Sequence, residues 1–312
     1  MTSSKCSYGN DVIEVLESGS IGNSIIYLKE VLVDIGLPYS TLKEHIKEVK
    51  YLLLTHEHQD HLLPATLQAI IINRPDIKIF IPDYLVDFIK NLKVGRKPII
   101  LPQNYHIYRK TEEGYPAVSI NDYQFQPVLL QHNVMNCAYK IWKFAEDNQK
   151  PFKILHATDT NTLIGIYALE YDLYAIEFNY ETKTTSALIY RANRNGRFIH
   201  QINSIKNHNS FENAQKFLDE NAGENSQVVA LHISGQYDDK LHLLAKHDVP
   251  YPIDYYNKRL SRSILLNTVK PVEVPAKIKE VLVKKTSRIV KIKPKTATKK
   301  QILATKSKLN TK

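Results

Sequence analysis

The stretch that most constrains this chain is Thr55-His56-Glu57-His58-Gln59-Asp60-His61, in which three histidines and one aspartate fall within six positions. It follows an apolar run, residues 51–54, and precedes a helix-like stretch, residues 62–72. Imidazole and carboxylate groups are the ligands that zinc and similar divalent metals prefer. A loop between a strand and a helix can turn such side chains toward one point. The spacing therefore predicts a metal site rather than a solvated histidine-rich loop.

Charge is concentrated at one end of the chain. Of 312 residues, 43% are hydrophobic, which is enough to bury one large core or two modest ones. Residues 271–312 hold 13 Lys or Arg against 2 Asp or Glu, whereas residues 1–270 hold 29 against 30. The body is nearly neutral, and the basic tail has too few large apolar residues to form a core. We expect a disordered tail that either attracts phosphate backbones or only aids solubility.

Cysteine content and hydropathy favour a cytoplasmic location. Cys6 and Cys137 are the only two cysteines, and their separation does not resemble a disulfide framework. No apolar run follows a basic segment at the amino terminus, and no stretch of about 18 apolar residues is uninterrupted. We therefore expect neither secretion nor membrane spans.

Apolar spacing predicts strands that alternate with helices, an arrangement typical of layered α/β packing. The expected strands lie at residues 12–16, 24–28, 31–35, 52–54, 78–81, 117–130, 152–157, 172–180 and 228–231. The expected helices lie at residues 38–49, 64–73, 82–92, 163–169 and 210–221.

Histidines and acidic residues recur where the later strands end. His132, Asp159 and His232 each follow an apolar strand, and Glu177 lies near the end of another. A side chain at the carboxyl end of a strand is well placed to reach a metal, and the cluster at 56–61 needs further ligands. For Asp159 the alternative is a helix cap, and for Glu177 it is an exposed charge.

The pattern His-x-His-x-Asp-His after a strand resembles the signature of the metallo-β-lactamase-fold hydrolases. Later segments resemble the phosphodiesterase branch of that superfamily, which includes tRNase Z and the related single-domain 5′ exonucleases. These segments are the turn at residues 18–24, Thr158-Asp159-Thr160, and the ending at residues 232–237. The resemblance covers roughly residues 12–237.

This resemblance implies a four-layer αβ/βα sandwich. We expect a hydrolase domain at residues 1–250, a connecting segment at 251–270 and the Lys-rich tail at 271–312. It also implies two zinc ions, with manganese as a substitute. One ion would be held by His56, His58 and His132, the other by Asp60, His61 and His232, with Asp159 shared.

The chemistry implied by the resemblance is phosphodiester hydrolysis by a metal-bound hydroxide. Asp60, Glu177 and His208 are the expected catalytic residues, with His208 protonating the leaving oxygen and Glu177 assisting it. Asn209 separates His208 from Ser210, so the match to the His-Ser motif of tRNase Z is loose.

The substrate stays open at this stage. A nuclease acting on DNA or RNA is favoured by the basic tail and by the exonuclease-like turn. A cyclic-nucleotide phosphodiesterase is the alternative, because the body is nearly neutral. The long Gly/Pro-rich insertion by which tRNase Z grips transfer RNA is absent from the sequence, which argues against transfer RNA processing. A non-catalytic binding protein is less favoured, and a homodimer is left open.

Overall fold

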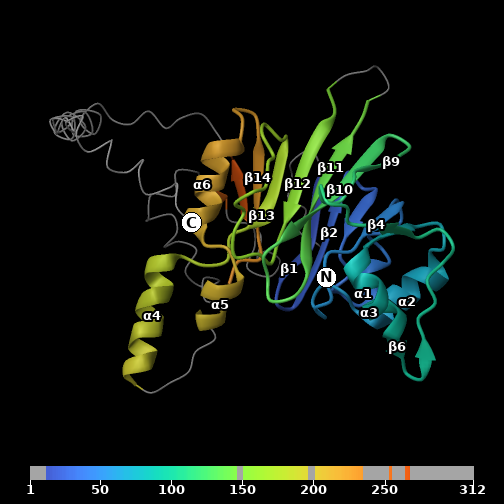
Figure 1. Cartoon of the computed structure of the whole chain (residues 1–312), viewed down its shortest axis with the longest axis horizontal. Coiled ribbons are helices and arrows are strands. Elements are labelled where there is room, and N and C mark those ends of the chain that lie inside the picture. Colours follow the sequence, from blue (N-terminus) through green and yellow to red (C-terminus); the bar gives the residue numbers. More distant parts are fainter. Residues whose placement is uncertain (1–11, 146–149, 196–200, 235–252, 255–263, 268–312) are drawn as a thin grey trace, which may run out of the picture. The chain divides into compact units, whose positions relative to one another are not determined.

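Two β-sheets form the centre of the structure (Figure 1). This computed structural model describes residues 12–145, 150–195, 201–234, 253–254 and 264–267, all within the unit Met1–Val269. The Lys-rich tail expected at residues 271–312 lies outside the described residues. Within the described part of the chain, no helix is long and apolar enough to cross a membrane.

The first sheet has the strand order β1-β2-β3-β4-β5-β8. The amino-terminal strands β1, β2 and β3 pair antiparallel, and the later strands add in parallel. The bounds are β1 Ile13–Gly19, β2 Gly22–Tyr27, β3 Val31–Val33, β4 Tyr51–Leu53, β5 Lys78–Pro82 and β8 His106–Tyr108. Strands β6 (Lys93–Val94) and β7 (Lys97–Pro98) form a separate hairpin.

The second sheet has the strand order β15-β16-β14-β13-β12-β11-β10-β9, in which β12, β13 and β14 are parallel. The bounds are β9 Val118–Ile120, β10 Tyr123–Leu130, β11 Asn136–Lys143, β12 Phe152–Ala157, β13 Leu173–Glu177, β14 Gln227–Leu231, β15 Ile253–Asp254 and β16 Ile264–Asn267. The segment expected to be a connection thus contributes two short strands, β15 and β16, to the edge of this sheet.

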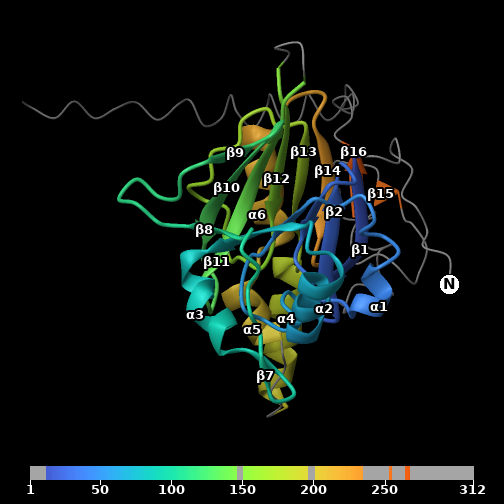
Figure 2. The same ribbon diagram turned by 90° about the vertical axis from the view of Figure 1, so that its right-hand side faces the viewer.

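Helices cover the outer faces of the two sheets, as Figures 1 and 2 show. Helices α1 (Tyr39–Leu42), α2 (Pro64–Asn73) and α3 (Asp83–Asn91) lie beside the first sheet, and α6 (Phe211–Asn221) lies beside the second. Helices α4 (Thr182–Arg194) and α5 (Gln201–Asn207) precede α6 in the chain.

Alternation along each strand separates three apolar layers. In β2, Ile25 and Tyr27 pack between the sheets, whereas Ile26 packs toward the helices. In β13, Leu173 likewise faces the other sheet and Tyr174 faces α6. Because side chains of a strand alternate between its two faces, each sheet can bury both of them. The expected four-layer αβ/βα sandwich is confirmed.

Two of the helix predictions differ from the structure. Residues 163–169 form turns rather than a helix, with Gly165 at φ +88° and Ile164 88% exposed. The apolar spacing there reflects alternate buried and exposed residues of an irregular segment. The helix expected at residues 38–49 is also shorter, because α1 ends at Leu42 and turns follow.

A polar contact joins the two sheets at the β2–β3 turn. Glu30 accepts hydrogen bonds from Tyr123 (2.8 Å) and Lys143 (3.1 Å) of the second sheet and from Lys50 of the first. Burial opposes ionisation of Glu30, but these three donors outweigh it and lower the pKa of its carboxyl to about 2.

We predict that Glu30→Gln lowers the free energy of unfolding by about 1 kcal/mol near neutral pH, a value that allows for solvent screening. Because the folded-state pKa of Glu30 is depressed, its contribution is complete above the ordinary glutamate pKa of 4.5 and declines as the pH falls toward 2. Urea unfolding at several pH values should show the difference from wild type shrinking below pH 5. Glu48→Gln, at an exposed position, is the matched control. An equal loss in both variants would contradict the assignment.

Candidate metal centre

Strand β4 delivers the histidine cluster into a tight turn. The amides of His61 and Leu62 both donate to the carbonyl of His58, at 2.9 and 2.8 Å. This turn places the rings of His56 and His61 side by side, with centroids 4.1 Å apart, and both side chains are buried. The compact spacing of the motif therefore produces one ligand cluster at the carboxyl end of the strand.

Three parallel strands of the second sheet bring further groups to the same place. β12, β13 and β14 end just before Asp159, at Glu177 and just before His232, respectively. Parallel strands end at one edge of a sheet, so these side chains converge. Asp159 and His232 both adopt φ +53°, a backbone conformation that non-glycine residues seldom adopt and that concentrates at functional sites.

The structure brings all seven expected metal ligands together. Their ligand atoms fall into groups in which every atom lies within 4.8 Å of the others. Asp159 lies between the groups, with Oδ2 2.8 Å from Nε2 of His61 and Oδ1 3.7 Å from Nε2 of His232. These groups are His56, His58 and His132, then Asp60, His61 and His232, and then His56, His61 and Asp159.

Two ring nitrogens of this cluster are buried without a hydrogen-bond partner. They are Nε2 of His132 and Nε2 of His232. Leaving such an atom unsatisfied costs about 1–3 kcal/mol, and native structures seldom retain several together. Imidazole nitrogens without partners that face a carboxylate are a donor set that binds a divalent cation, so the residues fit a dinuclear metal site.

The electrostatic surroundings keep most of these groups ready to bind a cation. Burial lowers the pKa of His56 and of His132, which favours the neutral imidazole that a metal requires. Burial opposes ionisation of Asp159, but His232 and His61 outweigh it and hold its pKa well below the ordinary value. The carboxylate is therefore ionised near neutral pH.

Asp34 contacts the ring nitrogen of His61 that does not face the cluster. The ligand set predicted from the sequence did not include Asp34. Its Oδ2 lies 2.6 Å from Nδ1 of His61, and it accepts hydrogen bonds from the amide and hydroxyl of Thr55 at 2.8 and 2.6 Å. Burial opposes protonation of His61, but Asp159 and Asp34 raise its pKa well above the ordinary value. Asp34 thus directs Nε2 of His61 toward Asp159. The sequence feature that could have indicated this role is the position of Asp34 directly after the apolar strand β3.

The turn between β1 and β2 supports the site from the other side. Ser18 accepts a hydrogen bond from the amide of His232 at 2.8 Å, and the amide of Asn23 donates to the carbonyl of Asp60 at 2.6 Å. A Cβ at Gly36 would lie 1.8 Å from that same carbonyl oxygen, so only glycine allows the backbones to approach. The amino-terminal turn therefore fixes both halves of the centre.

Glu177 holds two histidines at once. Its Oε1 lies 2.7 Å from Nδ1 of His208 and 2.9 Å from Nδ1 of His232, and its Oε2 accepts from the amide of Thr160 at 2.9 Å. Burial opposes ionisation of Glu177, but His208 outweighs it and lowers its pKa. Burial also opposes protonation of His208, whereas Glu177 raises the pKa of His208 to about 9. A pKa in this range favours the protonated imidazole near neutral pH. Nδ1 of His208 also lies 3.6 Å from Oδ1 of Asp159.

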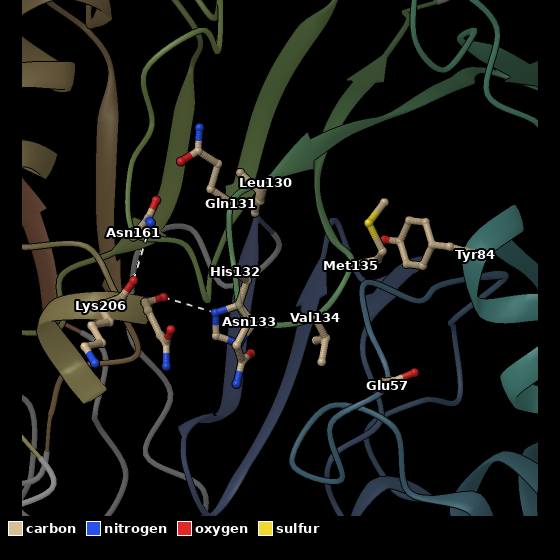
Figure 3. Close-up of a pocket in the computed structure, with 11 residues that line it drawn as sticks. Glu57, Tyr84, Leu130, Gln131, His132, Asn133, Val134, Met135, Asn161 and Lys206 are labelled. Atoms are coloured by element: carbon tan, nitrogen blue, oxygen red, sulfur yellow. Dashed lines mark hydrogen bonds between the residues drawn. The ribbon is translucent and has the colours of Figure 1, made fainter. Parts of the chain in front are cut away.

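A cavity of about 730 Å³ opens beside His132 (Figure 3). Asn161 and Lys206 lie on one side of His132, and Met135 and Tyr84 lie on the other. Nδ1 of His132 donates to the carbonyl of Asn207 at 3.0 Å, which leaves its Nε2 to face the centre. A ligand in this cavity would therefore lie next to the candidate metal ligands.

Solved structures with similar folds support this description. The short form of human tRNase Z matches with a TM-score of 0.51 at 18% identity, over 72% of this chain and 93% of that one. The metallo-beta-lactamase fold protein YhfI from Bacillus subtilis matches with a TM-score of 0.52 at 16% identity, over 75% and 90%. A long form RNase Z from yeast matches with a TM-score of 0.50 at 15% identity, over 82% of this chain and 40% of that one.

At the level of sequence, neither a protein-family model nor a curated protein matches this chain. The likeness therefore rests on the arrangement of the strands and helices, which at these identities shows the fold alone. The two helix-covered sheets, together with these neighbours, establish that the chain has the metallo-β-lactamase fold.

Proposed function

We propose that this protein is a dinuclear metal-dependent phosphodiester hydrolase, and specifically a nuclease that acts on DNA or RNA. The observation that carries the proposal is the position of Asp159 between two three-ligand groups, beside a buried glutamate whose carboxylate is hydrogen-bonded to His208. The names of two of the fold neighbours, tRNase Z and RNase Z, point to the same class of substrate.

We assign the seven ligands to two ions in the way that the sequence resemblance implies. His56, His58 and His132 would hold one ion, Asp60, His61 and His232 the other, and Asp159 would contact both. Zinc suits this mixture of imidazole and carboxylate ligands, and manganese is the expected substitute. When bound, the ions would polarise the phosphoryl group and make a water acidic enough to attack it near neutral pH.

The remaining residues handle the leaving group. His208 is 19% exposed and so can reach a substrate, while Glu177 behind it is fully buried. Glu177 keeps His208 protonated, and a positioned imidazolium can donate its proton to the departing oxygen. Asp60 is 25% exposed and its Oδ2 lies 3.9 Å from His61 Nε2. In this proposal it would contact the attacking water as well as a metal.

A cyclic-nucleotide phosphodiesterase is the second candidate. The cavity beside His132 has the size of a small-molecule site, into which a mononucleotide would fit. A non-catalytic binding protein is disfavoured, because the structure brings the whole ligand set together. A cytoplasmic location and a homodimer stay predictions.

The proposal predicts that the zinc-loaded protein cleaves single-stranded DNA or RNA and turns over cyclic mononucleotides far more slowly. EDTA should abolish cleavage, and added zinc or manganese should restore it. The measurement is product formation from all three substrate classes under identical conditions. Cleavage of cyclic nucleotides alone would favour the second candidate, and a protein that binds no metal would overturn both.

Asp34→Asn is expected to weaken metal binding about 10- to 100-fold, because it replaces one of the two acceptor oxygens that hold Thr55 and His61 with an NH2 donor. Metal affinity is measured by competition with a chelator of known strength, together with the melting temperature of the apoprotein. Asp87→Asn, at an exposed position on α3, is the control. Unchanged affinity in Asp34→Asn would show that His61 needs no such orientation.

His208→Ala should lower kcat on a polynucleotide about 100- to 10,000-fold, the usual range for a lost general acid. Zinc content should not change. The loss should be much smaller on bis(p-nitrophenyl) phosphate, whose leaving group needs no proton. His45→Gln, remote from the centre and paired with Glu14, is the control. A loss of the same size on both substrates would contradict proton donation by His208.

A further inference from the structure

Within the nearly neutral body, the longest segment without an acidic residue is residues 182–211. Residues 182–211 hold five Lys or Arg and no Asp or Glu, while residues 1–270 as a whole are balanced at 29 against 30. The structure describes most of this segment as α4 and α5. This segment is therefore net positive, and one of its basic residues, Lys206, lines the cavity beside His132.

The exposed face of α4 is basic and aromatic. At 100° per residue, Lys183, Tyr190 and Arg194 share one face, with Arg191 at its border. All four are exposed, Tyr190 by 64%, and the Arg194 guanidinium carbon lies 6.0 Å from the centre of the Tyr190 ring. The opposite side is buried at Thr185 and Ala192. The side of α4 that is free to meet a partner thus carries cations beside an aromatic ring.

Both ends of this segment are anchored at the centre. At its start, the Thr182 hydroxyl donates to Glu212 at 2.8 Å. At its end, Lys206 lines the cavity, and the carbonyl of Asn207 accepts the hydrogen bond from His132. His208, the proposed proton donor, follows directly. Figure 1 shows α4 extending away from the sheets between these anchors.

We propose that the exposed face of α4, together with Lys206, binds a stretch of single-stranded polynucleotide adjacent to the phosphate that is cleaved. This inference rests on the proposed nuclease function and names its substrate as a polymer. Lys183, Arg191 and Arg194 neutralise successive phosphates, and a base stacks on Tyr190. The 13 residues of α4 span about 20 Å, which is more than a mononucleotide can contact while it occupies the cavity.

The test measures binding rather than cleavage. The probe is a fluorescently labelled single-stranded phosphorothioate 20-mer, as DNA and as RNA, titrated with the full-length, zinc-loaded protein at several salt concentrations. Arg191→Glu/Arg194→Glu should weaken binding at least tenfold. It should also reduce the slope of log K against log salt by about 1.4, because each neutralised phosphate of a single strand contributes about 0.7. Tyr190→Ala should weaken binding about fivefold or more through lost stacking.

The matched control is Lys43→Glu/Lys216→Glu, which changes the net charge equally at exposed positions beside the first sheet and on α6. Melting temperature and zinc content verify that every variant is folded. A control that weakens binding as much as the α4 variant, or an α4 variant that binds like wild type, would overturn the inference. If the wild type binds the 20-mer through α4 but cleaves no phosphodiester, the proposed function fails and this binding surface stands.

Discussion

The metal centre depends on one buried carboxylate placed between the two sheets. Asp159, at the end of β12 in the second sheet, faces His61 from the loop after β4 in the first sheet, at 2.8 Å. An ionised carboxylate that is buried is costly unless cationic or hydrogen-bonding groups surround it. The histidines of both sheets provide that environment, and it exists only while the sheets stay packed. The apolar layer between them, which includes Tyr27 and Phe125, is thus a condition for the site as well as for stability.

Strand register makes the arrangement precise. Glu177 pairs with Leu231 across β13 and β14, so the glutamate lies one residue from the level of His232 and can contact its Nδ1. A slip of one residue would turn Glu177 to the opposite face of the sheet. Asp34 and Glu177 have the same role in the two sheets. Each carboxylate contacts the Nδ1 atom of a candidate metal ligand, Asp34 that of His61 and Glu177 that of His232.

The sequence was most informative where chemistry and local structure coincide. The motif from His56 to His61 combines ligand type with a tight turn, and an Asp or His after an apolar strand can be predicted to reach the same sheet edge. Asp34 was not predicted to support the site, because its role depends on a contact with His61, which is distant in the sequence. The helix expected at residues 163–169 was wrong because apolar spacing alone does not reveal which residues are exposed. Helix α4 was missed because the positions that it buries, Thr185 and Ala192, carry no large apolar side chain.

The position of α4 and α5 in the chain also separates the proposed polynucleotide-binding surface from the proposed catalytic residues. They lie between Glu177 and His208, so a loose segment would displace the proposed proton donor. The Tyr180–Ser210 bridge and the hydrogen bond from Thr182 to Glu212 close this segment at its base. His208 is therefore fixed both by its hydrogen bond with Glu177 and by these contacts between the two ends of the segment. Contacts made along α4 can therefore change the affinity for a polymer while the geometry of His208 stays the same.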